Sequence, residues 1–504
     1  MVESNGMPAG RTGNGDDAGG GIDVDVVIIG AGISGIGTAI ELGRRETGKT
    51  FTILEARDAI GGTWDLFRYP GIRSDSDVQT FSYGFKPWTG DTMIAPGEEI
   101  RDYVREAARE YGVEDKIRFR HKVTGADWDS ATQSWAVTCE VTGADGSVRT
   151  ETVHATWLFN ASGYYRYDKA NNPELPGRED FEGEIIHPQY WPEGFDYSGK
   201  KIVVLGSGAT AVTLIPSLAD KAESVTMLQR TPTYMFPLPR VSPLVKPMRK
   251  LFGVERAHHI MRAIHIEFQA TQYAILRRFP AFGRKFIEAF AKRYLPKGYP
   301  MDPNFTPPYN PWDQRLCVVP DGDLFTVIAE GKADIVTDTI DHLTSDGIVT
   351  ASGKHLPCDL LVTATGFILQ PLGGIALSVD GQPIEVGQHA AYKGIMLSDV
   401  PNLAFAVGYT NSSWTLKIGL LATHFTRLLR YMDERGFRVA TPRFSGDFAA
   451  TRPLLDFGAG YVKRNEDKLP RVLDEGTWTI GNRYVDDRKV LLKGRIDDPD
   501  LEFS

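Results

Sequence analysis

The stretch DVDVVIIGAGISGIGTAIELGRR, residues 23–45, carries the pattern that decides the fold. Its β-branched run, residues 24–29, is typical of a buried strand, and the apolar residues after the glycines recur at helical spacing. Between strand and helix, Gly30, Gly32 and Gly35 form GxGxxG, a turn that lets the backbone and a helix N-terminus approach a pyrophosphate. The order strand, glycine turn and helix predicts a dinucleotide-binding unit of Rossmann type.

The strand that follows supports this prediction. FTILEA, residues 51–56, contains Glu55, which is placed where a carboxylate accepts hydrogen bonds from the ribose of a bound dinucleotide. GxGxxG by itself also fits a glycine-rich turn without a ligand, which is the competing interpretation. Together with its strand, its helix and its acidic residue, the pattern favours a bound nucleotide.

The same unit occurs a second time. KIVVLGSGATAVTLIPSLA, residues 201–219, contains Gly206, Gly208 and Ala211 as GxGxxA, and the next strand ends at Arg230. An arginine in the place of the carboxylate is a donor to phosphate, so this unit is predicted to prefer the 2′-phosphate of NADP. The alternative is that Arg230 is an ordinary solvated arginine.

Two dinucleotide sites in one chain predict two cofactors that exchange hydride, and one of them must be a flavin because two nicotinamides together achieve little. LFNASGY (158–164) and DLLVTATGF (359–367) resemble the junctions at which two-domain flavoproteins pass between their FAD and NADPH domains. The resemblance implies an α/β fold with two Rossmann-like domains, the NADPH domain inserted in a discontinuous FAD domain. The predicted boundaries are 1–22 for a disordered tail, 23–165 and 358–504 for the FAD domain, and 166–357 for the NADPH domain with a helical insertion at about 240–300.

Composition narrows the class of protein. A chain of 504 residues exceeds the size of a single hydrophobic core, and a net charge of -9 argues against a nucleic-acid-binding protein. The three cysteines are widely separated, so we predict no disulfide framework, metal site or redox dithiol, and a cytoplasmic location. No stretch approaches the roughly 18 uninterrupted apolar residues of a membrane-spanning helix.

A connector between the two glycine turns carries a family resemblance. FEGEIIHPQYWP (181–192) contains the pattern FxGxxxHxxxWP, which resembles the fingerprint of type I Baeyer-Villiger monooxygenases. The residues that match it are Phe181, Gly183, His187, Trp191 and Pro192. In that family the segment is a hinge or domain-linking element, so we predict a structural and gating role for His187. Packing alone is the competing interpretation.

The resemblance extends over nearly the whole chain beyond the tail. GGTWDLFRYPGIRSDSDVQTFSYGF (61–85) and YNPWDQRLCVVPDGDLF (309–325) are similar to the subgroup that contains the mycobacterial ethionamide-activating monooxygenase. By this resemblance Arg315 is the active-site arginine and Asp75 is the carboxylate that holds it. Most members carry a lysine just before that arginine, whereas this chain has Gln314, which removes one expected contact with NADP.

The resemblance also implies the chemistry. NADPH reduces FAD, the reduced flavin takes up O2 as a C4a-peroxyflavin, and this attacks a ketone to give an ester or lactone, or a thioether to give a sulfoxide. Arg315 is then expected to stabilise the developing negative charge. The predicted cofactor-binding residues are Gly30, Gly32, Gly35, Glu55, Gly62, Thr63 and Trp64 for FAD, Gly206, Gly208, Ala211, Arg230 and Thr231 for NADPH, and also Asp75, Val123 and Gly366.

Three other functions compete with this prediction. A flavin-dependent N- or S-hydroxylating monooxygenase shares both Rossmann units, but its fingerprint ends in Tyr and a basic residue, where this chain has Trp191 and Pro192. A disulfide reductase needs a paired dithiol. A nucleotide sensor without catalysis would have little use for Arg315 and Asp75.

One basic segment is open to two interpretations. Residues 240–297 contain thirteen Lys or Arg against three Glu, interleaved with aromatic residues. The simpler interpretation is a helical part of the NADPH domain with a solvated basic face. The alternative is a peripheral surface that meets anionic lipid and admits apolar ketones.

Overall fold

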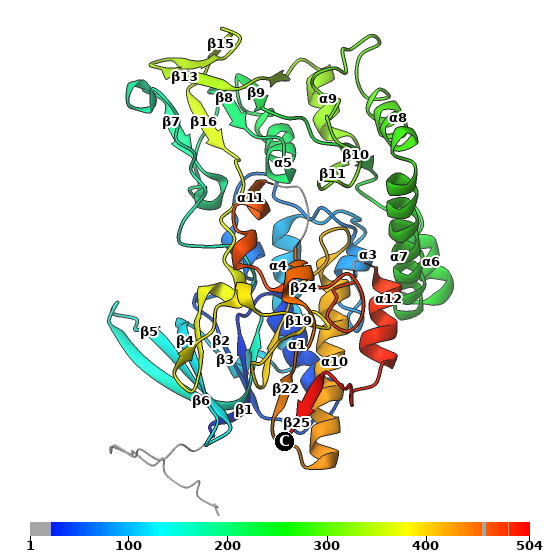
Figure 1. The fold of residues 1–504 in the computed structure, drawn as a ribbon. Coiled ribbons are helices and arrows are strands. Elements are labelled where there is room, and N and C mark those ends of the chain that lie inside the picture. Colours follow the sequence, from blue (N-terminus) through cyan, green and yellow to red (C-terminus); the bar gives the residue numbers. More distant parts are fainter. Residues whose placement is uncertain (1–21, 456–459, 482) are drawn as a thin grey trace, which may run out of the picture.

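The computed structural model describes residues 22–455, 460–481 and 483–504 (Figure 1). Of the predicted tail, only Ile22 lies within the described residues. The chain forms two α/β units, one above the other in Figure 1, each built around its own sheet. The predicted α/β fold class is therefore confirmed.

The first unit contains an eleven-stranded mixed sheet whose centre is β1, with β2 and β6 paired to it in parallel. Its strands are β1 Val24–Ile29, β2 Phe51–Leu54, β3 Ile117–Arg118, β4 His121–Asp129, β5 Ser134–Thr142, β6 Val148–Asn160, β17 Ala376–Val379, β18 Gln382–Pro383, β19 Ala391–Tyr392, β20 Met396–Leu397 and β21 Leu403–Phe405. Its helices are α1 Ile33–Arg44, α2 Thr63–Leu66, α3 Val78–Phe81, α4 Gly97–Glu110, α10 Trp414–Arg435, α11 Gly460–Lys463 and α12 Tyr484–Arg488.

The β-branched run of β1 explains why this strand is central. Successive side chains of a strand point to opposite faces of its sheet, and both faces are covered here. Val26 and Ile28 contribute to one hydrophobic core, in which α1 and α10 pack. Val27 and Ile29 contribute to a second core on the other face, with strands β4 and β5. Two small antiparallel pairs complete the unit, β22 Ala440–Pro442 with β25 Leu501–Phe503 and β23 Arg452–Pro453 with β24 Arg471–Val472.

The second unit contains a five-stranded parallel sheet in the order β12, β9, β8, β16, β7. These strands are β7 Glu184–Ile186, β8 Lys201–Leu205, β9 Ser224–Gln229, β12 Ala333–Thr337 and β16 Leu360–Thr363, with helices α5 Ala209–Leu218 and α9 Asp323–Ala329. A parallel pair, β10 Met235–Leu238 and β11 Cys317–Pro320, and an antiparallel sheet, β13 Ile340–Thr344, β14 Gly347–Thr350 and β15 His355–Pro357, lie beside it.

The sheet pairing corrects one predicted boundary. β16 (Leu360–Thr363) pairs with β7 and β8 inside the second sheet, so the chain returns to the first unit only after Thr363 and not at residue 358. A short apolar strand such as LLVT does not by itself indicate which of the two sheets it joins, because both sheets contain buried parallel strands. The connector FEGEIIHPQYWP supplies β7, which is the edge strand of this sheet.

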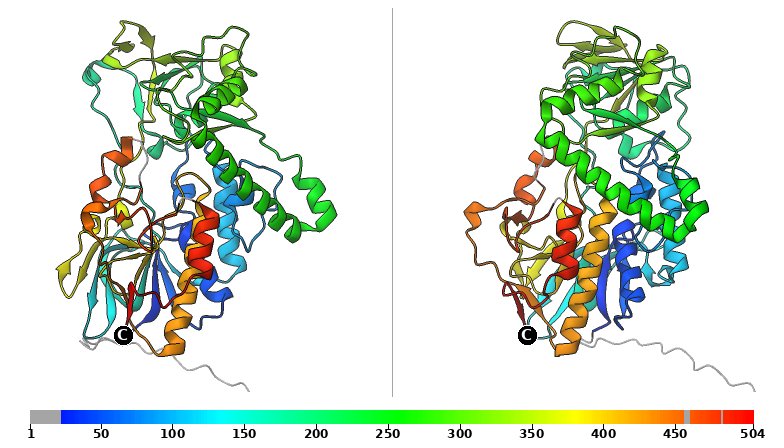
Figure 2. Two further views of the ribbon diagram at one scale, coloured as in Figure 1. Left: turned by 45° about the vertical axis from the view of Figure 1, so that its right-hand side comes forward. Right: turned by 90° about the vertical axis from the view of Figure 1, so that its right-hand side faces the viewer.

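Three helices occupy the stretch predicted as a helical insertion: α6 Val245–Phe252, α7 Val254–Arg278 and α8 Pro280–Ala291. Figure 2 shows that α6 and α7 extend from the second unit along the side of the first. The inner side of α7 contacts α3 of the first unit through hydrogen bonds. None of the described helices combines the length and the apolar character needed to cross a bilayer.

The two crossings between the units run side by side. The backbone N–H of Arg166 donates to the carbonyl of Ile368 at 2.9 Å, and that of Gln370 donates to Tyr164 at 2.8 Å. The side chains of Asn171 and Thr365 add two hydrogen bonds between the same segments. The units are therefore joined by two segments that are hydrogen-bonded to each other rather than by two independent linkers.

Candidate active site

The first glycine turn has the geometry that a pyrophosphate needs. Gly30 has φ +96°, a conformation that residues with a side chain rarely adopt. A Cβ on Gly35 would lie 1.9 Å from the carbonyl oxygen of Gly30, so only glycine lets α1 pack this closely. The N-cap of α1 is Gly32, which has no side chain to occupy the helix N-terminus. The N–H groups of that terminus are thus available to an anion.

Glu55 lies against this turn. Its carboxylate accepts hydrogen bonds from the backbone N–H of Ala31 at 2.7 Å and of Arg57 at 2.9 Å, and its side chain is buried. Burial raises its pKa, although these hydrogen bonds oppose the shift. Val123, another predicted FAD-binding residue, is buried on β4 in the core below the sheet.

The segment Gly62, Thr63 and Trp64 faces the first turn. A Cβ on Gly62 would lie 3.1 Å from the Cα of Gly32, so the two glycine-bearing backbones come together here. The Thr63 hydroxyl lies 3.2 Å from the hydroxyl of Tyr167, which belongs to the first crossing. The chain thus brings its predicted flavin-side segment, the glycine turn and a domain crossing into one place.

The second glycine turn is open at its tip. Gly206 has φ +134°, and a Cβ on it would lie 2.4 Å from the carbonyl oxygen of Ala364. Gly208 has open space on the side where its Cβ would be, and it is the uncapped N-cap of α5. Arg230 is exposed at the end of β9. Ser207, which the sequence did not single out, ties the turn to this strand end because its hydroxyl donates to the carbonyl of Thr231 at 2.7 Å.

Arg315 and Asp75 meet, as the family resemblance implied. The guanidinium Nη2 lies 2.8 Å from Oδ2 of Asp75, and both side chains are about one third exposed, with 35% and 31% of their surfaces accessible. Tyr164 stands near both charges, and burial raises the pKa of its hydroxyl. Its ring stacks on Trp414 with centroids 5.2 Å apart. Tyr164 was missed, although it stands in the quoted junction LFNASGY.

His187 connects the fingerprint segment to the second crossing. Its Nδ1 accepts from the backbone N–H of Gln189 at 3.1 Å, and its Nε2 lies 3.3 Å from the carbonyl oxygen of Gly366, to which it donates. Burial lowers the pKa of His187, so the ring is neutral near pH 7. The Gln189 amide donates to the carbonyls of Arg166 and Tyr167 at 2.9 Å each, which attaches the same segment to the first crossing.

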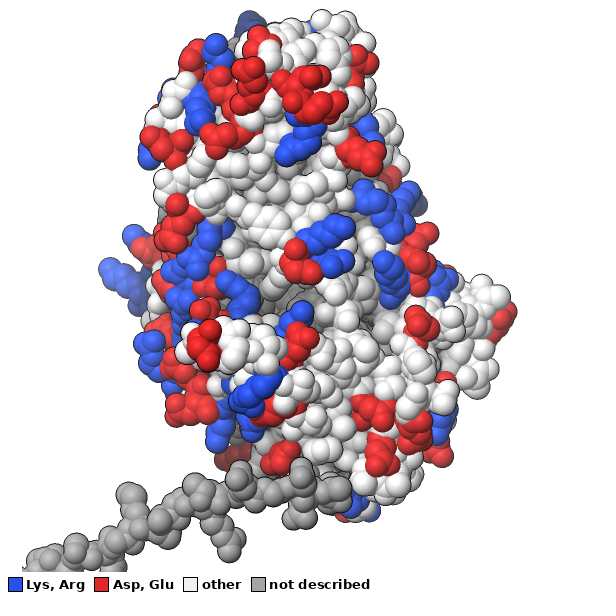
Figure 3. All heavy atoms as spheres, turned by 90° about the vertical axis from the view of Figure 1, so that its left-hand side faces the viewer, with Lys and Arg blue, Asp and Glu red and all other residues white. Residues whose placement is uncertain are grey.

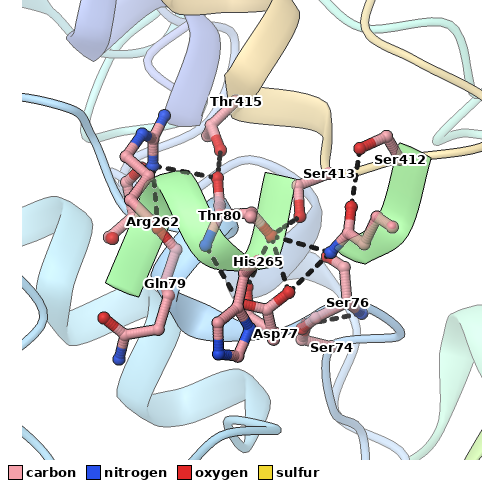
Figure 4. Close-up of polar contacts among 12 residues, drawn as sticks. Ser74, Ser76, Asp77, Gln79, Thr80, Arg262, His265, Ser412, Ser413 and Thr415 are labelled. Carbon is pink, nitrogen blue, oxygen red and sulfur yellow. Dashed lines mark hydrogen bonds and ion pairs between the residues drawn. The ribbon is translucent and has the colours of Figure 1, made fainter. Parts of the chain in front are cut away.

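A polar cluster beside the Arg315–Asp75 pair was not predicted (Figure 4). It surrounds α3, the one-turn helix that follows Asp75, and combines side chains of α7 and of the start of α10. Asp77, the N-cap of α3, forms an ion pair with His265 at 2.9 Å. The only local signal in the sequence was the Asp77–Thr80 spacing of a helix cap.

The charged surface agrees with the acidic composition. Acidic and basic side chains are intermixed over the face shown in Figure 3 and do not gather there into one basic surface.

The three cysteines, Cys139, Cys317 and Cys358, are buried free thiols. Burial raises the pKa of Cys317, two residues beyond Arg315, to about 12, so this thiol stays protonated near pH 7.

Comparison with known proteins finds close relatives over almost the full chain. A family model described as pyridine nucleotide-disulphide oxidoreductase matches residues 27–278. The FAD-containing monooxygenase EthA of Mycolicibacterium smegmatis is 48% identical over 481 residues, which cover 95% of this chain and 97% of the relative. The probable FAD-binding monooxygenase AlmA of an Acinetobacter species is 44% identical over 95% of this chain and 96% of its own length.

Solved structures share the fold. The open crystal structure of cyclohexanone monooxygenase superimposes with a TM-score of 0.73 at 23% identity and covers 95% of this chain and 99% of its own. A crystal structure of OTEMO in complex with FAD and NADP gives a TM-score of 0.71 at 21% identity, with 96% and 100% of the two chains covered.

Proposed function

The chain belongs to the family of FAD-containing monooxygenases, and within that family we propose that it is an NADPH-dependent Baeyer-Villiger monooxygenase. It would insert one atom of O2 beside a ketone carbonyl to give an ester or lactone. The observation that supports this proposal most is the Arg315–Asp75 ion pair, which joins the two nucleotide-binding units.

The two glycine turns fit the two cofactors. The uncapped N-terminus of α1, with Glu55 beside it, would hold the pyrophosphate and ribose of FAD. The open turn at Gly208, with Arg230 and Thr231 at the adjacent strand end, would hold NADPH. When bound, FAD reduced by NADPH supplies the activation of O2, which no amino-acid side chain provides.

The protein's own contribution is electrostatic. A guanidinium carries its charge at every working pH, so Arg315 stabilises negative charge that develops on oxygen during the transfer. Asp75 orients that guanidinium through an ion pair of 2.8 Å. The Arg315 side chain is about one third exposed.

Oxygenation at sulfur or nitrogen is the alternative within the same family. A positive charge beside the flavin would assist transfer to a thioether as it assists transfer to a ketone. The fingerprint ending in Trp191 and Pro192 favours the Baeyer-Villiger reaction. The two reactions differ in product, so they are separated directly by experiment.

The test uses the purified, FAD-loaded protein with NADPH, ¹⁸O2 and a panel of linear and cyclic ketones, with thioethers in parallel. We expect NADPH oxidation that depends on the ketone and an ester or lactone that contains one ¹⁸O atom, measured by mass spectrometry. Sulfoxide formation with no ester from any ketone would replace the Baeyer-Villiger proposal by the alternative.

We also propose that the helical insertion contacts an anionic lipid surface. Among the described residues, eleven of the sixteen large hydrophobic side chains that are exposed lie between residues 241 and 294. On α7, Ile264, Phe268 and Ile275 are 49%, 56% and 42% exposed at helical spacing, so they form one outer stripe, and Phe279, the C-cap of the helix, is 55% exposed. The inner side of the same helix carries Arg262 and His265.

An ordinary surface helix exposes a mainly polar side, whereas α7 exposes this apolar stripe as well as charged residues such as Arg277 and Arg278. The thirteen Lys or Arg against three Glu in residues 240–297 contrast with the net charge of -9 of the whole chain. An anionic bilayer would therefore attract this part of the protein more than any other and would cover the outer stripe. Such a bilayer also holds apolar ketones.

A further inference from the structure

The one-turn helix α3 (Val78–Phe81) lies between two parts of the candidate active site. Its N-cap, Asp77, follows Asp75 by two residues, so the cap and the partner of Arg315 share one short loop. At its other end, Phe81 packs edge-on against Trp64 of the flavin-side segment, with ring centroids 5.6 Å apart. The position of α3 therefore sets the positions of the loop with Asp75 and of Trp64.

Helix α7 of the insertion holds α3 at its N-terminus (Figure 4). The Nδ1 of His265 lies 2.9 Å from Oδ1 of Asp77, and the amide of Gln269 donates to Oδ2 at 2.6 Å. Asp77 also accepts from the backbone N–H of Thr80 at 3.1 Å, which closes the cap. A side chain of the inserted helix thus completes the cap of a helix in the other unit.

The same helix also holds the C-terminal end of α3. One guanidinium nitrogen of Arg262 donates to the carbonyls of Gln79, Thr80 and Ser82 at 2.9, 3.1 and 2.7 Å. These are carbonyls that a one-turn helix leaves without partners of its own. Because both ends of α3 are bound by α7, α3 cannot move relative to the insertion without breaking these bonds.

The start of α10 adds a third element. The hydroxyl of Ser413 lies 2.6 Å from that of Thr80, and the hydroxyl of Ser412 donates to the amide oxygen of Gln269 at 2.7 Å. Trp414, the next residue of α10, stacks on Tyr164 near the Arg315–Asp75 pair. The cluster therefore connects the insertion to the active-site loop from two directions.

The charges in this cluster depend on each other. The pKa of Asp77 is lowered overall. Burial acts in the opposite direction, but the hydrogen bonds of Asp77 and the charge of His265 outweigh it. The pKa of His265 is raised overall. Burial acts in the opposite direction, but the hydrogen bond with Asp77 and the charge of Asp77 outweigh it. Arg262 is the other charged group that faces α3. Loss of His265 would leave the Asp77 carboxylate, which is only 5% exposed, without the imidazole that pairs with it.

We propose that His265 is a positioning residue for the reaction: through Asp77 it holds the loop that carries Asp75, so that Arg315 stays oriented at the flavin. This proposal rests on the proposed monooxygenase function but not on whether the product is an ester or a sulfoxide. The observation behind the proposal is that His265, a side chain of the inserted helix α7, binds Asp77 in the loop that carries Asp75.

The test compares four variants of the FAD-loaded protein. His265→Ala removes the imidazole that pairs with Asp77, and His265→Asn keeps a hydrogen-bond donor at this position. Gln269→Ala removes the other donor from α7 to Asp77. His259→Ala is the matched control because His259 is exposed on the same helix. The first measurement is amide hydrogen exchange of residues 73–82. The second is the share of oxidised NADPH that appears as oxygenated product rather than as hydrogen peroxide.

We expect His265→Ala to retain FAD, to exchange residues 73–82 at least tenfold faster, and to lose at least fivefold in product per NADPH while hydrogen peroxide rises. His265→Asn is expected to recover about half of this loss, Gln269→Ala to show a smaller change in the same direction, and His259→Ala to behave as the unchanged protein.

Unchanged exchange and unchanged product yield in His265→Ala would overturn the proposal. So would loss of bound FAD in His265→Ala, His265→Asn and Gln269→Ala alike, because the cluster would then serve folding rather than positioning. If the unchanged protein forms neither ester nor sulfoxide, the proposed function fails, and the exchange measurement still decides whether His265 holds the loop.

Discussion

The guanidinium of Arg315 lies 2.8 Å from the carboxylate of Asp75, although Asp75 precedes α3 in the first unit and Arg315 precedes β11 in the second. This ion pair is thus itself a contact between the units. Relative movement of the units would change the distance between these two charges, so we expect domain movement to be coupled to the proposed chemistry at this pair.

Arg315→Ala is expected to fold, to bind FAD and to be reduced by NADPH, but to form at least 100-fold less ester, because a preorganised charge at developing negative charge is lost. Arg315→Lys restores the charge without the planar donor group and is expected to recover only part of the rate. Arg109→Ala, which removes an arginine that is 74% exposed, serves as control. Normal ester formation by Arg315→Ala would contradict the mechanism.

Arg230→Ala is expected to lower kcat/KM for NADPH by roughly 10- to 100-fold, since a hydrogen bond between charged groups contributes about 1.5–3 kcal/mol. The value for NADH should hardly change, because NADH has no 2′-phosphate. Steady-state kinetics with both nucleotides measures the ratio, and Arg178→Ala, another exposed arginine of the second unit, is the control. An unaltered preference would show that another residue binds the 2′-phosphate.

His187→Ala is expected to keep FAD bound and to lose turnover and coupling of NADPH oxidation to product. The ring joins the fingerprint segment to Gly366 of the second crossing, and this hydrogen bond of 3.3 Å disappears. Stopped-flow reduction and product yield measure the two effects separately. The exposed His342 offers a control, and a His187→Ala protein that couples as well as His342→Ala would leave the fingerprint without a role in turnover.

Acid is expected to destabilise the protein through buried histidines. Burial lowers the pKa of His424 to about 3, and burial together with the charge of Arg262 lowers that of His258 to about 4. The unfolded chain takes up these protons near pH 6.5, whereas the folded chain does so only below pH 4 or 3, so acid favours unfolding. Each histidine contributes a loss of about 1.4 kcal/mol per pH unit in this window.

The variant His424→Asn tests this explanation. Asn can still donate to the Leu491 carbonyl, which His424 Nδ1 reaches at 2.9 Å, but it takes up no proton. Urea unfolding at several pH values between 7 and 4 should therefore give a shallower fall in the free energy of unfolding than for the unchanged protein. The same slope in both proteins would assign the acid sensitivity to other groups.

The lipid proposal predicts flotation with vesicles. The protein should float with vesicles that contain 30% phosphatidylglycerol in phosphatidylcholine, and added salt should weaken this binding. Phe268→Glu should reduce it severalfold because it places an anion on the outer stripe of α7. Phe448→Glu, at an exposed phenylalanine outside the insertion, is the control.

Two results would contradict the lipid proposal. Equal flotation of Phe268→Glu and Phe448→Glu would show that the outer stripe is not the contact. No flotation, together with a change in apparent size of Phe268→Glu in size-exclusion chromatography, would identify a second copy of the chain as the partner of this face.

Both glycine turns and the strands and helices around them could be predicted from the sequence alone. These features are encoded locally, because a strand, a turn with positive φ and a helix N-terminus each depend on a few adjacent residues. The pairing of Arg315 with Asp75 is not local and was predicted only through family resemblance. This turn requires glycine at position 35, since a Cβ there would lie 1.9 Å from the carbonyl oxygen of Gly30.

How distant segments meet becomes visible only in the folded protein. β16 (Leu360–Thr363) lies in the second sheet, His187 has its partner at Gly366, and α7 turns Arg262 and His265 toward the first unit while Ile264, Phe268 and Ile275 are exposed. The partners of each of these groups stand far away along the chain. No local pattern can encode them, because burial and hydrogen-bond pairing arise only when the two units and the insertion are packed together.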